Sequence, residues 1–250
     1  RVTPNPRAGC VLVKNGRIVG AAAHQRLGGP HAEALALKEA GPRARGCTAY
    51  VSLEPCWPFK GKKTPSCAHA LAAAGVRRVV YPVIDPNPHV AGRGAKFLRR
   101  SGVQVSCDKS SALQSIALNR GFFSRMQRHR PWVILKTALS LDGKAATTTG
   151  QSRWITGQAA RSAVHRMRAE CDAILVGAGT ILADNPALTS HGYGPNPLRV
   201  VFAGRRKLPT NSRVFDATAE TVVYSIKKKK DMLAALRDLS QAGIGTLLVE

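Results

Sequence analysis

The chain has 250 residues, 44% of them hydrophobic, and no run of eighteen apolar residues that would span a membrane, so its length suits one large domain or two modest ones. Six cysteines spread among apolar stretches do not suggest a disulfide framework, and we expect a reducing compartment, the cytoplasm. The formal net charge is +24, but the basic residues are scattered rather than gathered in one stripe with aromatics, so nucleic acid is not the expected partner.

Strands and helices alternate in the first half of the chain. Residues 9–13 and 17–23 flank an Asn-Gly pair, which is typical of a tight hairpin turn. The pattern then predicts strands over 48–53, 78–83 and 103–107, and helices over 31–40, 67–74, 95–101 and 111–126. This alternation indicates a layered α/β unit.

A basic tract at residues 127–131 ends in Pro131, which cannot continue a helix. We therefore place a domain boundary there, with one domain over 1–128 and a second over 129–250. The second domain is also predicted to be α/β, with strands over 132–139, 173–176, 198–203, 221–224 and 246–250 and helices over 158–169 and 231–241. The chain opens on Arg1 and stops in an apolar stretch, so we expect a segment of a longer protein, with any targeting signals outside it.

Three potential zinc ligands and one carboxylate stand out from the remaining polar residues. His31 and Glu33 fall in the first turn of a predicted helix. Cys67 begins the next helix and Cys56 lies just past a strand, and a helix N-terminus favours thiolate over thiol. An imidazole and two thiolates can bind Zn²⁺ tetrahedrally and leave the fourth position for water. Glu33 can then move a proton from that water to a leaving amine, which is the chemistry of hydrolytic deamination.

Taken singly, these residues carry less information. A histidine near a helix start is usually a cap or a surface residue, and two cysteines ten residues apart are usually unrelated core thiols. Their joint occurrence is much rarer, so the sequence favours a metal site. Four other cysteines flank or lie in apolar runs and are expected to be packing residues: Cys10, Cys47, Cys107 and Cys171.

The first half resembles the deaminase half of the bifunctional riboflavin-biosynthesis deaminase–reductase family. The matching residues are Thr3-Pro4-Asn5-Pro6, Gly9-Cys10-Val11, Gly16, His24, Gly29-Pro30-His31-Ala32-Glu33, Leu53-Glu54-Pro55-Cys56, Asp85-Pro86-Asn87-Pro88, Val90, Gly92 and Gly94. The resemblance implies a cytidine-deaminase-like three-layer fold. It also implies a small phosphorylated substrate, 2,5-diamino-6-ribosylamino-4(3H)-pyrimidinone 5′-phosphate, whose ring amine is lost as ammonia.

The same resemblance implies roles for particular residues. His31, Cys56 and Cys67 would bind zinc, and Glu33 would be the catalytic acid and base. Asn5 and His24 would hold the substrate. Enzymes that resemble this chain commonly associate, so a homo-oligomer is one expectation.

The second half carries a series of short motifs: Leu135-Lys136, Ser140-Leu141-Asp142-Gly143-Lys144, Gly150-Gln151-Ser152, Trp154-Ile155-Thr156, Val176-Gly177, Gly179-Thr180, Asp184-Asn185-Pro186, Leu188-Thr189 and Leu198-Arg199-Val200-Val201. Through them it resembles the reductase half of that family. The resemblance implies a dihydrofolate-reductase-like α/β fold and NADPH-dependent reduction of the ribosyl group to a ribityl chain. The NADPH site implied by the resemblance comprises Ala138, Trp154, Thr180 and Asp184. The implied substrate contacts are Ser152, Arg168, Leu188 and Glu250.

Considered without the resemblance, some of these residues have plainer interpretations. Trp154 alone would be a core residue, and Arg168 alone would be a solvated residue on a helix. Asp184-Asn185-Pro186 alone would be a turn.

The chain also departs from the family. Ten residues separate Cys56 from Cys67, a longer loop than usual, and Trp57-Pro58-Phe59 replaces the polar residues that normally follow the first cysteine, whereas the Gly-basic-Thr-Pro portion survives at 61–65. His191 stands where the family often has an arginine, and Ala203-Gly204 replaces an acidic-hydroxyl pair. The family's Gly-rich cofactor loop would follow Glu250, so the reductase half is expected to be incomplete.

Three alternatives stay open at this point. One is a related enzyme in which only one half works, with the altered loop after Cys56 marking a lost or diverted deaminase. Another is a zinc deaminase that acts on nucleic acid, but such enzymes usually have two residues between the zinc cysteines and lack the motifs of the second half. The last is a basic binding module without catalysis, in which the histidine, glutamate and cysteine set would be coincidental.

Overall fold

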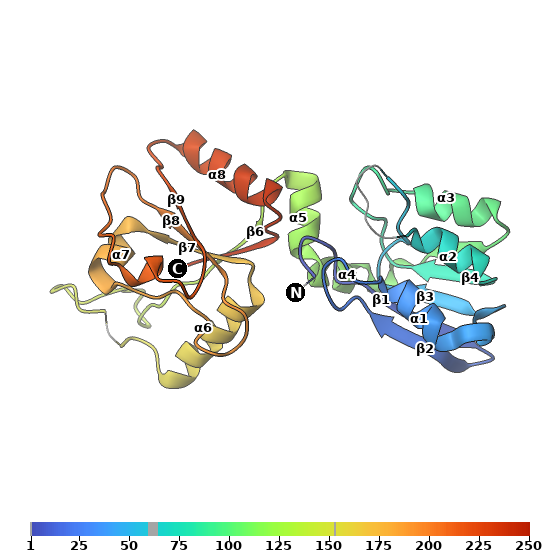
Figure 1. The fold of residues 1–250 in the computed structure, drawn as a ribbon. Helices are drawn as coiled ribbons and strands as arrows, with labels where there is room; N and C mark the ends of the chain where they lie inside the picture. Colours follow the sequence, from blue (N-terminus) through green and yellow to red (C-terminus); the bar gives the residue numbers. More distant parts are fainter. Residues whose placement is uncertain (1, 60–64, 153) are drawn as a thin grey trace. The chain divides into compact units, whose positions relative to one another are not determined.

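The computed structural model describes residues 2–59, 65–152 and 154–250. The chain divides into two compact units, Arg1–Arg128 and His129–Glu250, each with a five-stranded sheet and its own core (Figure 1). In the described part of the chain no helix is both long and apolar enough to cross a membrane.

The sheet of the first unit is mixed. Its strands, in spatial order, are β2 (Arg17–Ala23), β1 (Gly9–Lys14), β3 (Thr48–Val51), β4 (Arg78–Tyr81) and β5 (Gln104–Cys107). β1 pairs antiparallel with β2 and β3, whereas β3, β4 and β5 are parallel. The predicted hairpin is confirmed: Asn15 and Gly16 both have positive φ, which is the backbone of a tight turn between twisted strands.

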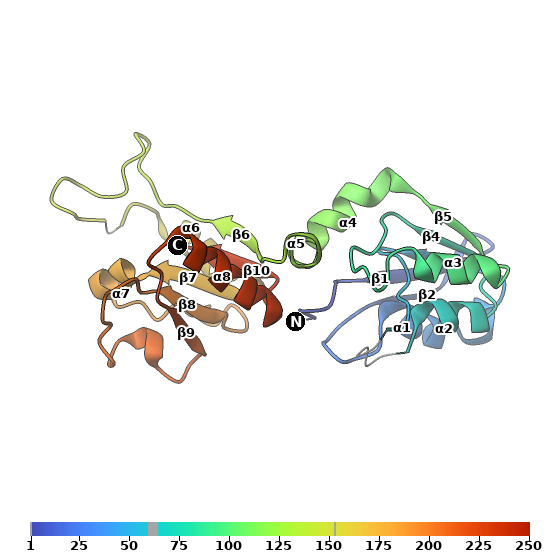
Figure 2. The ribbon, with the colours of Figure 1, turned by 90° about the horizontal axis from the view of Figure 1, so that it is seen from above.

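Three helices cover one face of this sheet, α1 (Ala32–Ala40), α2 (Cys67–Ala73) and α3 (Arg93–Arg100), and Figure 2 shows them side by side. A short 3-10 helix (Gly41–Ala44) follows α1. The core between helices and sheet is built mainly from small and aliphatic side chains, among them Ala36, Leu71 and Leu98. Small side chains let the helices lie close to the strands. The N-terminal ends of α1 and α2 lie near the start of β1 and the end of β3.

The helix expected over residues 111–126 is divided in two. After a 3-10 turn (Lys109–Ser111), α4 spans Ala112–Leu118 and α5 spans Arg120–Arg128. The break is at Asn119, whose side chain accepts from the Arg7 amide at 2.7 Å and donates to the Arg7 carbonyl at 2.9 Å. An asparagine that bonds to backbone groups competes with helix hydrogen bonds, so this long-range partner accounts for the break.

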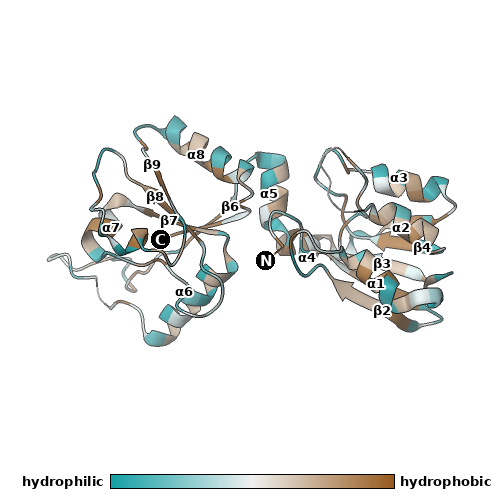
Figure 3. Ribbon diagram, in the orientation of Figure 1, coloured by the Kyte–Doolittle hydropathy of each residue, from teal (hydrophilic) through white to brown (hydrophobic). Residues whose placement is uncertain are grey.

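The sheet of the second unit is entirely parallel. Its strands, in spatial order, are β6 (Trp132–Leu135), β10 (Thr246–Val249), β7 (Ala173–Gly177), β8 (Leu198–Phe202) and β9 (Thr221–Tyr224). One face packs against α8 (Lys229–Gln241) through Leu239, and the other packs against α6 (Gln158–Glu170) and α7 (Ala178–Asp184) through Met167 and Ile181. Figure 3 shows apolar and polar residues alternating along α6 and α8, as expected for helices with one buried side.

Several details of the sequence interpretation change. α7 was not predicted, nor was the 3-10 turn Arg213–Phe215, and β6 ends at Leu135 rather than at residue 139. Cys107 is exposed, so its assignment as a packing residue is wrong, because β5 is an edge strand of its sheet. Cys10, Cys47 and Cys171 are buried as predicted.

Candidate metal centre and active site

Three predicted zinc ligands meet in the first unit. His31 is the N-cap of α1, Cys67 is the first residue of α2, and Cys56 follows β3 after a short extended segment. Nδ1 of His31 lies 3.5 Å from Sγ of Cys56 and 3.3 Å from Sγ of Cys67. The three potential ligand atoms all lie within 4.8 Å of one another.

This arrangement fits a tetrahedral zinc ion. A nitrogen and a sulfur bound to the same zinc at ordinary bond lengths are separated by about 3.6 Å, close to both separations here. One imidazole and two thiols also match the preference of zinc for nitrogen and sulfur ligands, and they leave a fourth position open.

The position of Cys56 is set by the backbone around it. Its carbonyl accepts hydrogen bonds from the Ser66 hydroxyl and the Ala68 amide, and its Sγ accepts from the Cys67 amide at 3.3 Å. On the other side, α3 approaches so closely that a Cβ on Gly94 would overlap the carbonyl oxygen of Pro55. The thiol is therefore held between the start of α2 and the first turn of α3.

Glu33 is 5% exposed, and its Oε2 is a buried atom with no hydrogen-bond partner among the described residues. Burial is the main cause that raises the pKa of its carboxyl, with the negative charge of Cys56 adding to it. A buried carboxyl oxygen without a partner is costly unless a ligand or water satisfies it. This feature distinguishes Glu33 from a carboxylate that serves only structure.

A cavity of about 420 Å³ opens beside these groups. Its polar lining comes from Asn5, His31, Glu33, Glu54, Cys56, Asp85 and Asn87, and its apolar lining includes Leu27, Val90, Phe59 and Phe122. Apolar walls with a few convergent polar groups are typical of a small-molecule site. Burial raises the pKa of Asp85 to about 7, and the charges of Glu54 and Cys56 act in the same direction.

Of the two residues predicted to hold substrate in this unit, one lines the cavity and the other supports it. The Nδ1 of His24 lies 3.0 Å from the Pro30 carbonyl, which assigns the ring proton to Nδ1. Its Nε2 is then the acceptor for the amide nitrogen of Asn5, at 3.4 Å. His24 also packs edge-on against the His31 ring, with centroids 5.1 Å apart.

Sequence reasoning matched Glu54 to the family but did not assign it a role. This buried carboxylate accepts hydrogen bonds from the amides of Gly92, Ala95 and Asp85, at 2.9, 3.2 and 3.3 Å. Glu54 thereby ties the strand that leads to Cys56 to the turn that carries Asp85 and to the start of α3. The only sequence feature that could have indicated a role for Glu54 is its position directly before Pro55-Cys56.

In the second unit, the predicted site residues follow the carboxyl ends of several strands. Ala138 comes after β6, Thr180 lies in the helix after β7, and Glu250 directly follows β10. In parallel sheets ligands bind at this edge. Asp184 ends α7 and is exposed, and Ser152 is exposed as well. The side chain of Leu188 is buried in the core and its φ is positive, so only its backbone is available to a ligand.

Two of the plainer interpretations are wrong. Arg168 is not a solvated helix residue, because its guanidinium donates to both carboxylate oxygens of Glu250, at 3.0 and 2.7 Å, and to the Thr189 carbonyl at 3.2 Å. Trp154 is not a core residue, since it is 70% exposed with the guanidinium of Arg161 over its ring at 4.3 Å.

Comparison with known proteins identifies the family. Residues 2–83 match the model of the cytidine and deoxycytidylate deaminase zinc-binding region, and residues 131–250 match that of the RibD C-terminal domain. The riboflavin biosynthesis protein RibD of Synechocystis sp. is 42% identical over 252 residues, covering 100% of this chain and 67% of that protein. This chain belongs to the RibD family.

Other members of the RibD family agree with this assignment. The RibD of Escherichia coli is 50% identical over 232 residues, which cover 87% of this chain and 62% of that protein. A crystal structure from Thermotoga maritima, described as a diaminohydroxyphosphoribosylaminopyrimidine deaminase/5-amino-6-(5-phosphoribosylamino)uracil reductase, superposes with a TM-score of 0.90 at 37% identity. The superposition covers 100% of this chain and 75% of the Thermotoga maritima chain. The predicted fold, a cytidine-deaminase-like domain followed by a dihydrofolate-reductase-like α/β domain, is confirmed as a deaminase domain followed by the RibD C-terminal reductase domain.

The aromatic residues that follow Cys56 are described in part by the structure. Trp57 packs away from the metal ligands, with its ring stacked on His69 of α2 at 5.1 Å and against Phe97 of α3 at 5.3 Å. The basic part of the loop, residues 60–64, lies outside the described residues.

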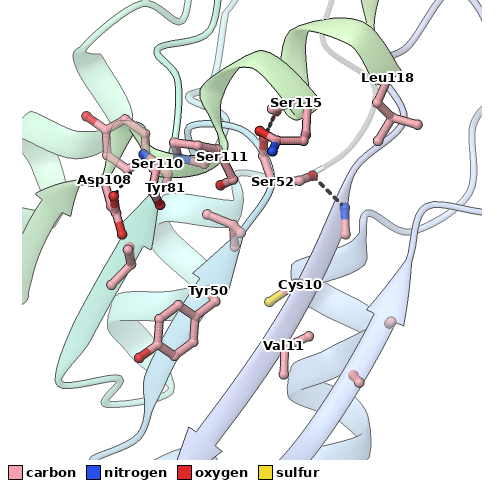
Figure 4. A pocket seen from close by; sticks show the side chains of 17 residues that line it. Cys10, Val11, Tyr50, Ser52, Tyr81, Asp108, Ser110, Ser111, Ser115 and Leu118 are labelled. Atoms are coloured by element: carbon pink, nitrogen blue, oxygen red, sulfur yellow. Dashed lines mark hydrogen bonds between the residues drawn. The ribbon is translucent and has the colours of Figure 1, made fainter.

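A second cavity, of about 800 Å³, lies on the sheet face that carries Tyr50. Tyr50 lies between Ala49 and Val51, which face the helices, so its own side chain points to the opposite face, where it is 48% exposed (Figure 4). Figure 4 also shows Ser115 of α4 bonded to the Ser52 carbonyl above these strands. None of the zinc-ligand candidates lines this cavity.

Proposed function

We propose that residues 1–128 form a zinc-dependent deaminase and residues 129–250 an NADPH-dependent reductase, acting in sequence in riboflavin synthesis. The first unit would act on 2,5-diamino-6-ribosylamino-4(3H)-pyrimidinone 5′-phosphate and release its ring amine as ammonia. The second would reduce the ribosyl group of the product to a ribityl chain. The observation that carries the proposal is the meeting of His31, Cys56 and Cys67 beside the buried Glu33.

The chemistry assigned to the first unit follows from these residues. Zinc held by His31, Cys56 and Cys67 would supply an activated water, since the metal lowers the pKa of a bound water to about 7. Glu33 takes the proton of the attacking water at its unpartnered Oε2 and delivers it to the departing amine nitrogen. The ring carbon gains a C–O bond and loses its C–N bond, and ammonia leaves.

Substrate positioning is assigned to groups that line the cavity. Asn5, with its orientation held by His24, presents an amide to the edge of the pyrimidine. The carboxyl group of Asp85 and the amide of Asn87 line the same cavity from another segment. The apolar walls exclude water from the reacting carbon, which strengthens these polar contacts.

For the second unit, the support is the RibD C-terminal match together with the position of its residues. Arg168, Thr180 and Glu250 lie near the carboxyl edge of the parallel sheet, where a dinucleotide and its partner substrate would meet. NADPH would supply the hydride. Trp154 offers an exposed aromatic face. The Arg168 fork binds Glu250 in two hydrogen bonds, which places an ordered, oppositely charged pair at this edge.

The test is to incubate the zinc-loaded chain with 2,5-diamino-6-ribosylamino-4(3H)-pyrimidinone 5′-phosphate and to measure the ammonia that it releases. The proposal expects bound zinc and stoichiometric ammonia, and in the full-length protein with NADPH present it expects NADPH oxidation that depends on the first product. Zinc binding without ammonia release would instead favour the related enzyme in which the altered loop marks a lost deaminase. Salt-sensitive RNA binding without turnover would favour a nucleic-acid ligand.

A further inference from the structure

The segment after Cys56 brings a phenyl ring to the cavity. Phe59 is only two residues beyond this potential zinc ligand and is half-buried. It lines the same cavity as His31, Glu33 and Asn5. Its ring is therefore close to the position where a reacting heterocycle would lie in the proposed deamination.

The start of this segment is anchored away from the cavity. Trp57 stacks on His69 with an interplanar angle of 26° and contacts Phe97, and those two rings are themselves 4.2 Å apart. Trp57 also packs against the main core of the unit. With Cys56 held by α2 and Trp57 held by α2 and α3, the backbone that leads to Phe59 is fixed at its start.

The Phe59 ring is held in place by a neighbouring aromatic ring. It stacks on the His89 ring at 5.6 Å between centroids, with an interplanar angle of 21°. His89 follows the turn that contains Asp85 and Asn87, and its amide donates to the Asn87 side chain at 3.0 Å. The stack thus joins two segments that both line the cavity, and His89 covers one face of the phenyl ring.

A flat heteroaromatic substrate needs two kinds of contact. Its edge carries donors and acceptors, which Asn5, Asp85 and Asn87 can meet, and its faces are apolar and polarisable. Aromatic side chains bind such faces by stacking. We propose that Phe59 is a specificity-determining residue that stacks on the pyrimidine ring of the substrate. The inference rests on the proposed function. It names Phe59 as the side chain that contacts the face of the substrate's pyrimidine ring.

The experiment compares three substitutions in the full, zinc-loaded chain. Phe59→Tyr keeps the ring, Phe59→Leu keeps apolar bulk without a ring, and Phe59→Ala removes both. For ammonia release, KM should stay near that of the unaltered chain with tyrosine and rise with leucine. With alanine it should rise by about tenfold or more, which is the loss expected when an aromatic partner of a stacked base is removed. The kcat should change much less than KM, because stacking acts on binding.

Two controls separate stacking from damage to the fold. Tyr50→Ala removes an aromatic side chain from the other face of the same sheet and should leave KM unchanged. Ribose 5-phosphate, which lacks the pyrimidine, should inhibit the Phe59→Ala and unaltered chains equally. If the Phe59→Ala chain loses zinc, the comparison of KM between the tyrosine and leucine variants, which both keep a large side chain, tests the stacking role.

Equal KM for the leucine variant and the unaltered chain would overturn the inference, and so would an alanine variant of unchanged KM. Failure of the proposed function is separable, because it appears as no ammonia from the unaltered chain. In that event, binding of the same compound is measured in chains that carry Glu33→Gln. A Phe59→Ala substitution that weakens Kd for the compound but not for ribose 5-phosphate supports the stacking role, and an unchanged Kd contradicts it.

Discussion

At the scale of single residues, Glu33 carries the strongest functional signal. A carboxylate that is 5% exposed usually has all of its oxygens hydrogen-bonded, as Glu54 in the same unit does. Glu33 Oε2 has no such partner among the described residues. The difference between two buried glutamates, one satisfied by backbone amides and one directed at a cavity, separates the structural role from the chemical one.

Glu33→Gln should keep the shape of the site but remove the group that transfers protons. We expect ammonia release to fall by about 10²–10⁴-fold, the usual contribution of a general acid–base group. Zinc content, measured by atomic absorption, should be unchanged because His31, Cys56 and Cys67 remain. NADPH oxidation by the full-length protein, with the deaminated intermediate supplied, is the internal control. Persistent deamination would show that another group moves the proton.

Asp85 gives the folded chain a distinct pH dependence. Its carboxyl has a pKa of about 7 when folded against 3.8 when unfolded, so the folded state holds the extra proton between these values. Stability from this group is therefore present at low pH and is lost as pH rises from about 4 to about 7, by up to about 4 kcal/mol. Asp85→Asn should flatten the profile over this window in urea unfolding.

The matched control for this profile is Asp108→Asn. Hydrogen bonds from Ser110 lower the pKa of Asp108, so this group titrates below the window. Its substitution should shift the stability by the same amount at every pH from 5 to 8. If Asp85→Asn also shifts the curve without changing its slope, the raised pKa of Asp85 is contradicted.

The parts of the site that could be predicted are those whose residues lie close together in the sequence or at the ends of predicted helices and strands. His31 and Glu33 are two residues apart and each cysteine lies at the end of an expected element, so the metal cluster could be predicted from spacing. The pairing of Arg168 with Glu250 joins residues 82 positions apart, and neither shows in the sequence that its partner is the other. The same holds for the Trp57 ring, whose partners come from two helices.

At the scale of elements, the site depends on where two helices begin. α1 and α2 start beside each other because their small buried residues, Ala32, Ala36 and Ala68, pack closely on the sheet. Strand and helix periodicity predicted most of these elements. It did not predict the break at Asn119, whose cause is Arg7, 112 residues away in the sequence. It also missed α7, which is only seven residues long.

Gly94→Ala tests whether α3 positions the metal centre. The added methyl group would overlap the Pro55 carbonyl, so either α3 or the backbone before Cys56 must move. We expect zinc affinity to fall by about 10–100-fold, as when groups that orient a metal ligand are disturbed. Lys96→Ala, on the exposed side of the same helix, should leave the affinity unaltered in a chelator competition. Equal affinities for the two variants would show that this contact does not orient Cys56.

At the scale of the whole chain, the two units have separate cores. Among the described residues, the cluster of potential metal ligands belongs to the first unit alone. Sequence patterning predicted this division because Pro131 and its basic flank interrupt the helix signal. It could not predict strand order, which in the second unit places the last strand in the interior of the sheet.

Zinc removal should therefore act on one unit. A ligand at a thousandfold its Kd stabilises the folded state by about 4 kcal/mol. In calorimetry, a chelator should lower the melting temperature of the first unit and leave the transition of the second in place. Added zinc should reverse the shift, and Cys56→Ser should reproduce it without chelator. A chelator that moves both transitions equally would contradict a site confined to the first unit.

The interior position of β10 has a consequence for synthesis on the ribosome. Among the described strands, β6 pairs only with β10, and β7 pairs with β10 on one side and with β8 on the other. Both strands are translated well before β10, since β6 ends at Leu135 and β7 at Gly177. Until then the nascent second unit presents open, apolar strand edges, which are the surfaces that chaperones bind and that aggregate when left alone. The first unit is free of this delay, because each of its strands after β1 pairs with one already made and the last, β5, lies at an edge of the sheet.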